Sequence, residues 1–309
     1  MSQHHHHDHD HSHSHASGLH PSRAFLIGII LNLSFVAVEA VYGFFSNSLA
    51  LLADAGHNFS DVIGLVLSWG AIWLAQRKAS QQFTYGLKGS TILAALANAI
   101  LLLIAVGAIV WEAIQRFRFP QPVPGVTMMA VACIGIAINA GTAFLFFKNR
   151  KSDINIKSAF LHMAADALVS VGVVVAGFVV LNTNWIWIDP LVGIIIAIVI
   201  TVGTWGLLKE SLNLALSAVP AGIDHSAVHQ FLENINGVSK VHDLHIWGMS
   251  TTETALTAHL VMPNGHSGDN FLKELSEEIQ HKFQIAHVTI QIERGNTNQV
   301  CELESAHDI

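Results

Sequence analysis

Charged residues are scarce in this chain, and their scarcity decides its broad class. Asp, Glu, Lys and Arg make up 12% of the 309 residues, whereas soluble globular domains contain about 25%. The hydrophobic share is 51% and the mean hydropathy is +0.47. This composition excludes an ordinary soluble domain and favours a membrane protein.

Cysteine is almost absent as well. The two cysteines, Cys133 and Cys301, are too few for a disulfide framework. No positively charged, cleavable signal peptide is expected at the start. The net charge of −7 is dilute and unevenly spread, so it indicates no particular partner. No nucleic-acid partner is expected.

Histidine, in contrast, is abundant and concentrated at one end. The chain has 20 histidines, and many lie in residues 1–21, a segment of His, Asp and Ser with almost nothing apolar. Such a segment cannot bury enough surface to fold alone, and His-rich tracts typically bind metal loosely. The run His4–His7 is either part of a purification tag or part of this tract.

Six apolar segments follow, and each is long enough to cross a hydrocarbon core of about 30 Å. They cover residues 24–45, 49–75, 91–112, 125–147, 158–181 and 186–208. The predicted fold class is therefore a membrane all-α domain of six transmembrane helices, over residues 22–211, followed by a smaller domain.

Positive charge orients these segments, because cytoplasmic connections carry an excess of Lys and Arg. Seven such residues lie in the second and fourth connections: Arg77, Lys78, Lys88, Lys148, Arg150, Lys151 and Lys157. The other three connections carry only Arg116 and Arg118. Connections two and four, and with them both termini, are expected in the cytoplasm.

The composition changes after about residue 210, and residues 212–294 have the pattern of a small α+β domain. Asp224 can cap a helix over 225–236, and residues 240–248 and 253–262 alternate like a hairpin of strands. A helical stripe over 269–283 and a third alternating segment over 287–293 complete the order αββαβ. Residues 295–309 are expected to form a loose tail.

Two polar motifs interrupt the apolar segments. Residues 54–61 (DAGHNFSD) contain His57 and Asp61, and residues 162–166 (HMAAD) contain His162 and Asp166. In each pair the His and Asp are four residues apart, so they share one helix face. Together they supply four ligands of the kind and number that a tetrahedral zinc site takes.

Other functions fit these motifs less well. Hydrogen bonding between helices explains one such motif easily, but not two with the same spacing. An intramembrane metalloprotease needs a general base, as in His-Glu-x-x-His, and the chain has no such motif. A closed four-ligand shell would hold an ion too tightly for a channel, whereas polar groups in mid-membrane are typical of a transporter.

Further polar residues lie near these motifs. Asp54 is open to two interpretations: a partner that orients His57, or a cap at the outer end of a broken helix. Glu39, in the first segment, either lines the ion path or packs against a neighbouring helix.

These motifs make the chain resemble the cation diffusion facilitator family, and specifically its bacterial zinc exporters. The resemblance covers residues 22–294 and rests on the six segments, residues 52–61 and 162–166, Asp189-Pro190 and residues 241–247 (VHDLHIW). It implies a homodimer in which each chain has a metallochaperone-like cytoplasmic domain. It also implies that the protein exports divalent metal in exchange for protons. Within that pattern, His57, Asp61, His162 and Asp166 match the transport site.

The resemblance also implies a site in the small domain, where His242 and His259 match zinc-binding positions of some relatives and Glu293 falls at a third. The alternative is that both histidines are exposed strand residues.

The expected function is proton-coupled zinc efflux by alternating access, with cadmium or cobalt as further substrates because they accept the same ligands; no enzymatic activity is expected. The competing class is a membrane metal sensor that binds but does not transport. Because the second and fifth segments run antiparallel, their motifs share a level only if the fifth helix starts near Ile154 and the second helix extends into the cytoplasm.

Overall fold

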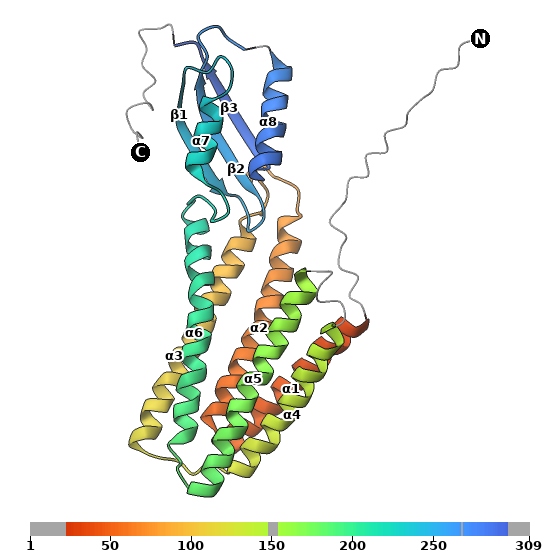
Figure 1. Ribbon diagram of the computed structural model, residues 1–309, viewed down its shortest axis with the longest axis vertical. Helices are drawn as coiled ribbons and strands as arrows, with labels where there is room; N and C mark the ends of the chain where they lie inside the picture. Colours follow the sequence, from red (N-terminus) through yellow and green to blue (C-terminus); the bar gives the residue numbers. More distant parts are fainter. Residues whose placement is uncertain (1–22, 148–153, 267, 296–309) are drawn as a thin grey trace, which may run out of the picture.

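Six long helices form the lower part of the molecule and a small α+β domain caps one end (Figure 1). The computed structural model describes residues 23–147, 154–266 and 268–295, except for the side chains of 23–29, 32, 61, 65, 68, 145–147 and 154–162. The six helices are α1 (Arg23–Phe45), α2 (Leu49–Ala75), α3 (Ser90–Arg118), α4 (Gly125–Phe147), α5 (Ile154–Thr183) and α6 (Ile188–Ala215). They confirm the predicted segments, and α5 begins at Ile154 as the shared level of the two motifs requires.

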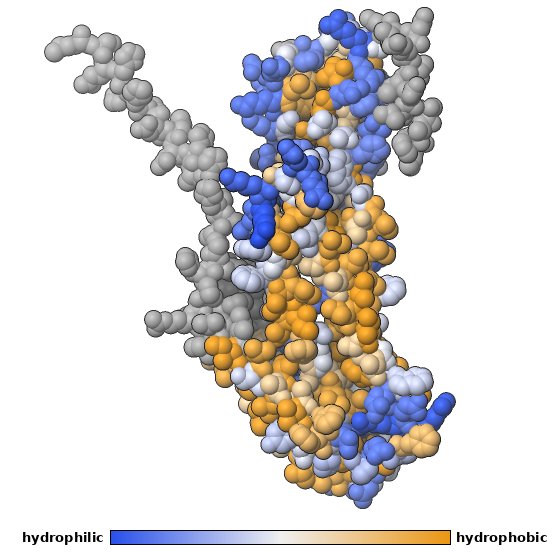
Figure 2. Space-filling model, turned by 180° about the vertical axis from the view of Figure 1, so that it is seen from behind, coloured by the Kyte–Doolittle hydropathy of each residue, from blue (hydrophilic) through white to orange (hydrophobic). Residues whose placement is uncertain are grey.

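The surface of the helices is that of a protein in lipid. In the described residues, five helices are long and apolar enough to cross a membrane, and α1 contributes a shorter apolar stretch, Leu33–Phe45. Large apolar side chains such as Trp69, Leu168 and Val202 are exposed. Figure 2 shows hydrophobic residues covering most of the helical part and hydrophilic ones gathered over the small domain.

Small residues let some helices approach closely. Helix α4 packs on α5, α3 on α6, and α1 against both α2 and α4. Where α4 meets α5, a Cβ on Gly125 would lie 2.6 Å from the carbonyl oxygen of Gly177. Neither position has room for a larger residue, as is usual where membrane helices pack backbone to backbone.

The small domain has the predicted αββαβ order. It contains α7 (His225–Glu233), β1 (Lys240–Gly248), β2 (Thr254–Val261), α8 (Asp269–Phe283) and β3 (His287–Glu293). Asp224 caps α7 as predicted, but the helix ends at Glu233 rather than at 236. The sheet order is β1-β2-β3, with β1 and β2 antiparallel and β2 and β3 parallel.

The small domain contacts the membrane domain at the α2–α3 connection. Lys88 forms an ion pair with Glu253, and the Thr251 backbone N–H donates to Thr91 Oγ1 at 3.1 Å. These contacts put the domain at the end of the helices where α2 finishes and α3 begins.

Candidate metal centre

Helices α2 and α5 each bring one described member of the His/Asp motifs to the same place. His57 lies eight residues after the start of α2, and Asp166 lies twelve residues after the start of α5. The two helices run in opposite directions and contact each other. The early start of α5 is what brings Asp166 level with His57.

The atoms of these two side chains are close enough to share an ion. His57 Nε2 lies 3.7 Å from Asp166 Oδ1, and Asp166 is 2% exposed. Ligand atoms of a tetrahedral zinc ion, with bonds of about 2.0–2.1 Å, lie about 3.3 Å apart. The observed separation is slightly wider, so a small side-chain movement would give ligand geometry.

The other two predicted ligands lie on the same helices, but their side chains are outside the described part. Asp61 is one turn after His57 on α2, and His162 is one turn before Asp166 on α5. Both displacements are toward the small domain, because the helices are antiparallel. The backbone therefore places Asp61 and His162 at one common level.

Asp54 lies one turn from His57 on the side away from the small domain. Of its two interpretations, the cap of a broken helix is wrong, because α2 is continuous and Ser48 is its N-cap. Asp54 Oδ2 instead accepts a hydrogen bond from Ser170 Oγ at 3.3 Å, and the Asn58 side chain donates to the Asp54 carbonyl at 3.0 Å. Asp54 thus links α2 to α5 just beyond the His57–Asp166 pair.

A second buried acid, Asp189 on α6, holds the start of α2. Its carboxylate accepts from Ser48 Oγ at 2.6 Å and from the Leu49 and Ala50 backbone N–H groups at 2.7 and 3.2 Å. Arg116 Nη1 lies 3.6 Å from the same carboxylate. Helix starts leave unpaired N–H donors that attract an anion. The sequence showed the residue but not this function, since the two segments are about 140 positions apart.

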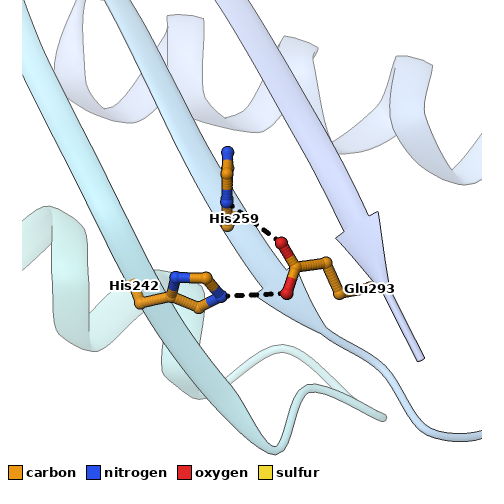
Figure 3. Close-up of side chains that lie close together, drawn as sticks. All are labelled: His242, His259 and Glu293. Carbon is orange, nitrogen blue, oxygen red and sulfur yellow. Dashed lines mark hydrogen bonds and ion pairs between the residues drawn. The ribbon is translucent and has the colours of Figure 1, made fainter. Parts of the chain in front are cut away.

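The small domain contains the other candidate site. His242 on β1 lies opposite His259 on β2 in the strand register, and Glu293 ends β3 (Figure 3). Glu293 Oε2 lies 3.2 Å from His242 Nε2, and Glu293 Oε1 lies 3.1 Å from His259 Nδ1. One ligand atom from each residue lies within 4.8 Å of the others. The structure therefore brings together all three residues predicted for this site.

The electrostatics of this cluster keep its carboxylate ionised. Burial raises the pKa of Glu293, but hydrogen bonds from Gln291 and His242 and the charges of both histidines outweigh it, so the net pKa is lowered. Its contribution to stability is therefore present above the ordinary carboxyl pKa and is lost as pH falls through the lowered value.

Sequence reasoning missed Asp243 as part of this site. The residue sits in a β-bulge with φ of 51°, and its Oδ2 lies 3.5 Å from His259 Nε2. A carboxylate on the second ring nitrogen fixes the tautomer of a ligand histidine. Adjacent His and Asp in a strand would normally face opposite sides, so only the bulge allows this contact.

Two family models match nearly the whole described chain. The cation efflux transmembrane domain matches residues 25–214, and the cytoplasmic domain of cation efflux proteins matches residues 220–295. The boundary between the matches falls just after α6.

Curated relatives match over most of their lengths. A cadmium, cobalt and zinc/H(+)-K(+) antiporter of Bacillus subtilis (strain 168) is 36% identical over 276 residues, which is 88% of each chain. Zinc transporter ZitB of Escherichia coli (strain K12) is 35% identical over 274 residues, 88% of this chain and 87% of its own. Metal cation efflux system protein CzcD of Cupriavidus metallidurans is 35% identical over 284 residues, 91% and 90% of the two chains. The chain therefore belongs to the cation efflux family of multi-pass membrane transporters and is not an enzyme.

Proposed function

We propose that this protein exports zinc from the cytoplasm in exchange for protons, by alternating access around a site of His57, Asp61, His162 and Asp166. The observation that carries the proposal is the approach of His57 to Asp166 between two antiparallel helices, at 3.7 Å and inside the membrane domain. Two imidazoles and two carboxylates neutralise one divalent ion and suit zinc, cadmium or cobalt. The Bacillus subtilis relative is named for cadmium, cobalt and zinc, and the Escherichia coli relative for zinc.

The level of the site within the helices suits alternating access. His57 lies about 12 Å along α2 from its outer start, with two-thirds of the helix between it and the small domain. The family match describes that domain as cytoplasmic, which supports a cytoplasmic C-terminus, and six spans would return the N-terminus to the same side. The metal would then enter from the end that the domain caps. In a bacterial cell this orientation carries zinc out across the inner membrane.

Proton exchange follows from the chemistry of the ligands. Zinc needs neutral imidazoles and ionised carboxylates, so metal and protons compete for the same lone pairs. Once zinc has left outward, protons replace it and neutralise the carboxylates. Their release toward the less acidic cytoplasm restores the site for metal.

This mechanism predicts a steep pH dependence of zinc binding and a coupled proton flux. Zinc affinity should fall as pH drops from about 7 to about 6, the range in which histidine ordinarily gains a proton. In proteoliposomes, zinc entry should be accompanied by proton exit, measured with one metal-sensitive and one pH-sensitive dye. Zinc flux without a pH change would contradict proton exchange but not the site. Zinc binding with no flux at all would favour the membrane sensor.

The small domain provides a second, regulatory zinc site, and its match to the cytoplasmic domain of cation efflux proteins supports a homodimer. His242, His259 and Glu293 supply three ligand atoms, and both imidazoles already lie next to the carboxylate. Three protein ligands leave a fourth position open on zinc, for water or a residue of the second copy.

Replacing His242 and His259 with alanine should remove about one zinc ion per chain while zinc flux continues at saturating metal. Equilibrium dialysis of the purified protein would measure the loss, with His266→Ala, in an exposed turn, as the control. If the double variant bound as much zinc as the parent, the three residues would not form a metal site.

A further inference from the structure

Glu39 is a buried acid on α1. The residue is 0% exposed, and neither carboxylate oxygen has a hydrogen-bond partner in the described part of the structure. A buried, uncompensated carboxylate is strongly unfavourable in a membrane interior. Such a group is retained only where a cation or a proton neutralises it in the working protein.

The carboxyl group of Glu39 faces Asp54. Asp54 is its strongest charged neighbour and Asp166 the next, and Asp54 itself is 1% exposed. Two ionised carboxylates offer acceptors only, so they cannot hydrogen bond to each other. Among the ion pairs of the described residues, none joins a Lys or Arg to either acid. The buried Arg116 pairs instead with Glu112 and Asp189.

The position of this pair along the helices matters as much as its charge. Asp54 is three residues nearer than His57 to the outer start of α2, and Ser170 is four residues nearer than Asp166 to the outer end of α5. Asp54 and Ser170 are joined by a hydrogen bond, so they form one layer. That layer lies about one helical turn, or about 5 Å, outward of the His57–Asp166 pair.

We propose that Glu39 and Asp54 form a second divalent-cation site, on the outward path, which receives the ion leaving His57 and Asp166. Ser170 Oγ, 3.3 Å from Asp54 Oδ2, adds a neutral oxygen beside the pair. The proposal rests on the proposed function, since it assumes that the neighbouring site carries zinc outward.

The donor sets of the two sites set the direction of the transfer. Oxygen-only sites suit harder ions such as Mg²⁺ or Mn²⁺, whereas imidazole favours zinc. Zinc is therefore held less tightly at Glu39 and Asp54, from where it can leave. A zinc ion on two His and two Asp ligands carries no net charge, so the outward pair still holds two negative charges that attract a second ion.

The test counts zinc bound to the full-length protein in detergent at saturating zinc and fixed pH, by equilibrium dialysis. Glu39→Gln keeps the size of the side chain and removes its charge, and it should lower the count by about one ion per chain. Asp54→Asn should remove the same zinc ion. It replaces Glu39→Gln as the test of the second site if Glu39→Gln aggregates on size-exclusion chromatography. Glu274→Gln, on the exposed face of α8, is the matched control and should keep the parent count.

His57→Ala separates this proposal from the proposed function. The His57→Ala substitution should remove a different zinc ion. The double variant with Glu39→Gln should therefore bind about two fewer zinc ions per chain than the parent. An unchanged count in Glu39→Gln would mean that protons neutralise the pair and would overturn the second site. A combined variant that loses only one ion would show a single shared site and overturn it equally. If His57→Ala bound as much zinc as the parent, the transport site would be refuted. The second, outward site would then be tested by the number of zinc ions bound to Glu39→Gln alone.

Discussion

Replacing Asp166 with alanine should abolish zinc transport while the protein remains folded. Asp166 is 2% exposed and has its Oδ1 at 3.7 Å from His57 Nε2, so its loss removes one of four proposed ligands and one of two compensating charges. Even residues that only orient metal ligands are worth about 10–100-fold, and a ligand should be worth at least about 100-fold. Zinc uptake into proteoliposomes would measure the loss.

Alanine is smaller than aspartate and should not disturb the fold. It also removes a buried charge that has to be neutralised whenever the site holds no metal. Size-exclusion elution and thermal unfolding are expected to match those of the parent. Asp269→Ala, an exposed acid at the start of α8, serves as the control for removal of a carboxylate elsewhere and should transport normally. Transport by Asp166→Ala near the parent rate would rule out the four-ligand assignment.

The largest loss of stability is expected from Asp189→Ala, at about 3–5 kcal/mol. Asp189 is 0% exposed and accepts from the first two backbone N–H groups of α2 and from Ser48. Without it, those donors are unpaired and Arg116, 7% exposed, loses a buried counter-charge. Thermal unfolding in detergent, followed by circular dichroism, would give the change.

Ser48→Ala tests the N-cap hydroxyl of α2 separately from the Asp189–Arg116 ion pair. This variant removes the N-cap hydroxyl, which accepts from the Leu51 N–H at 3.3 Å, but leaves Asp189 beside Arg116, so it should cost only about 1 kcal/mol. Because α2 carries His57, Asp189→Ala should also weaken zinc binding, whereas Ser48→Ala should leave it nearly unchanged. Equal losses of stability in the two variants would show that the ion pair contributes little.

Local patterns determined much of this protein. The spacing of four residues in each His/Asp motif put both members on one helix face, because an α-helix repeats every 3.6 residues. Alternation of apolar residues predicted all three strands of the small domain, and the antiparallel order of the second and fifth segments predicted the start of α5 at Ile154. These features depend on neighbours within a few positions or on helix direction, which a sequence displays directly.

The tertiary structure decided what depends on distant partners. Asp189 meets the start of α2 across about 140 positions, and Glu39 faces Asp54 from a different helix. Asp243 reaches His259 only because a bulge turns its side chain. Periodicity gives the face of an element on which a residue lies. Which face meets which depends on the packing of whole helices and strands, and that packing is set by contacts between segments far apart in the chain.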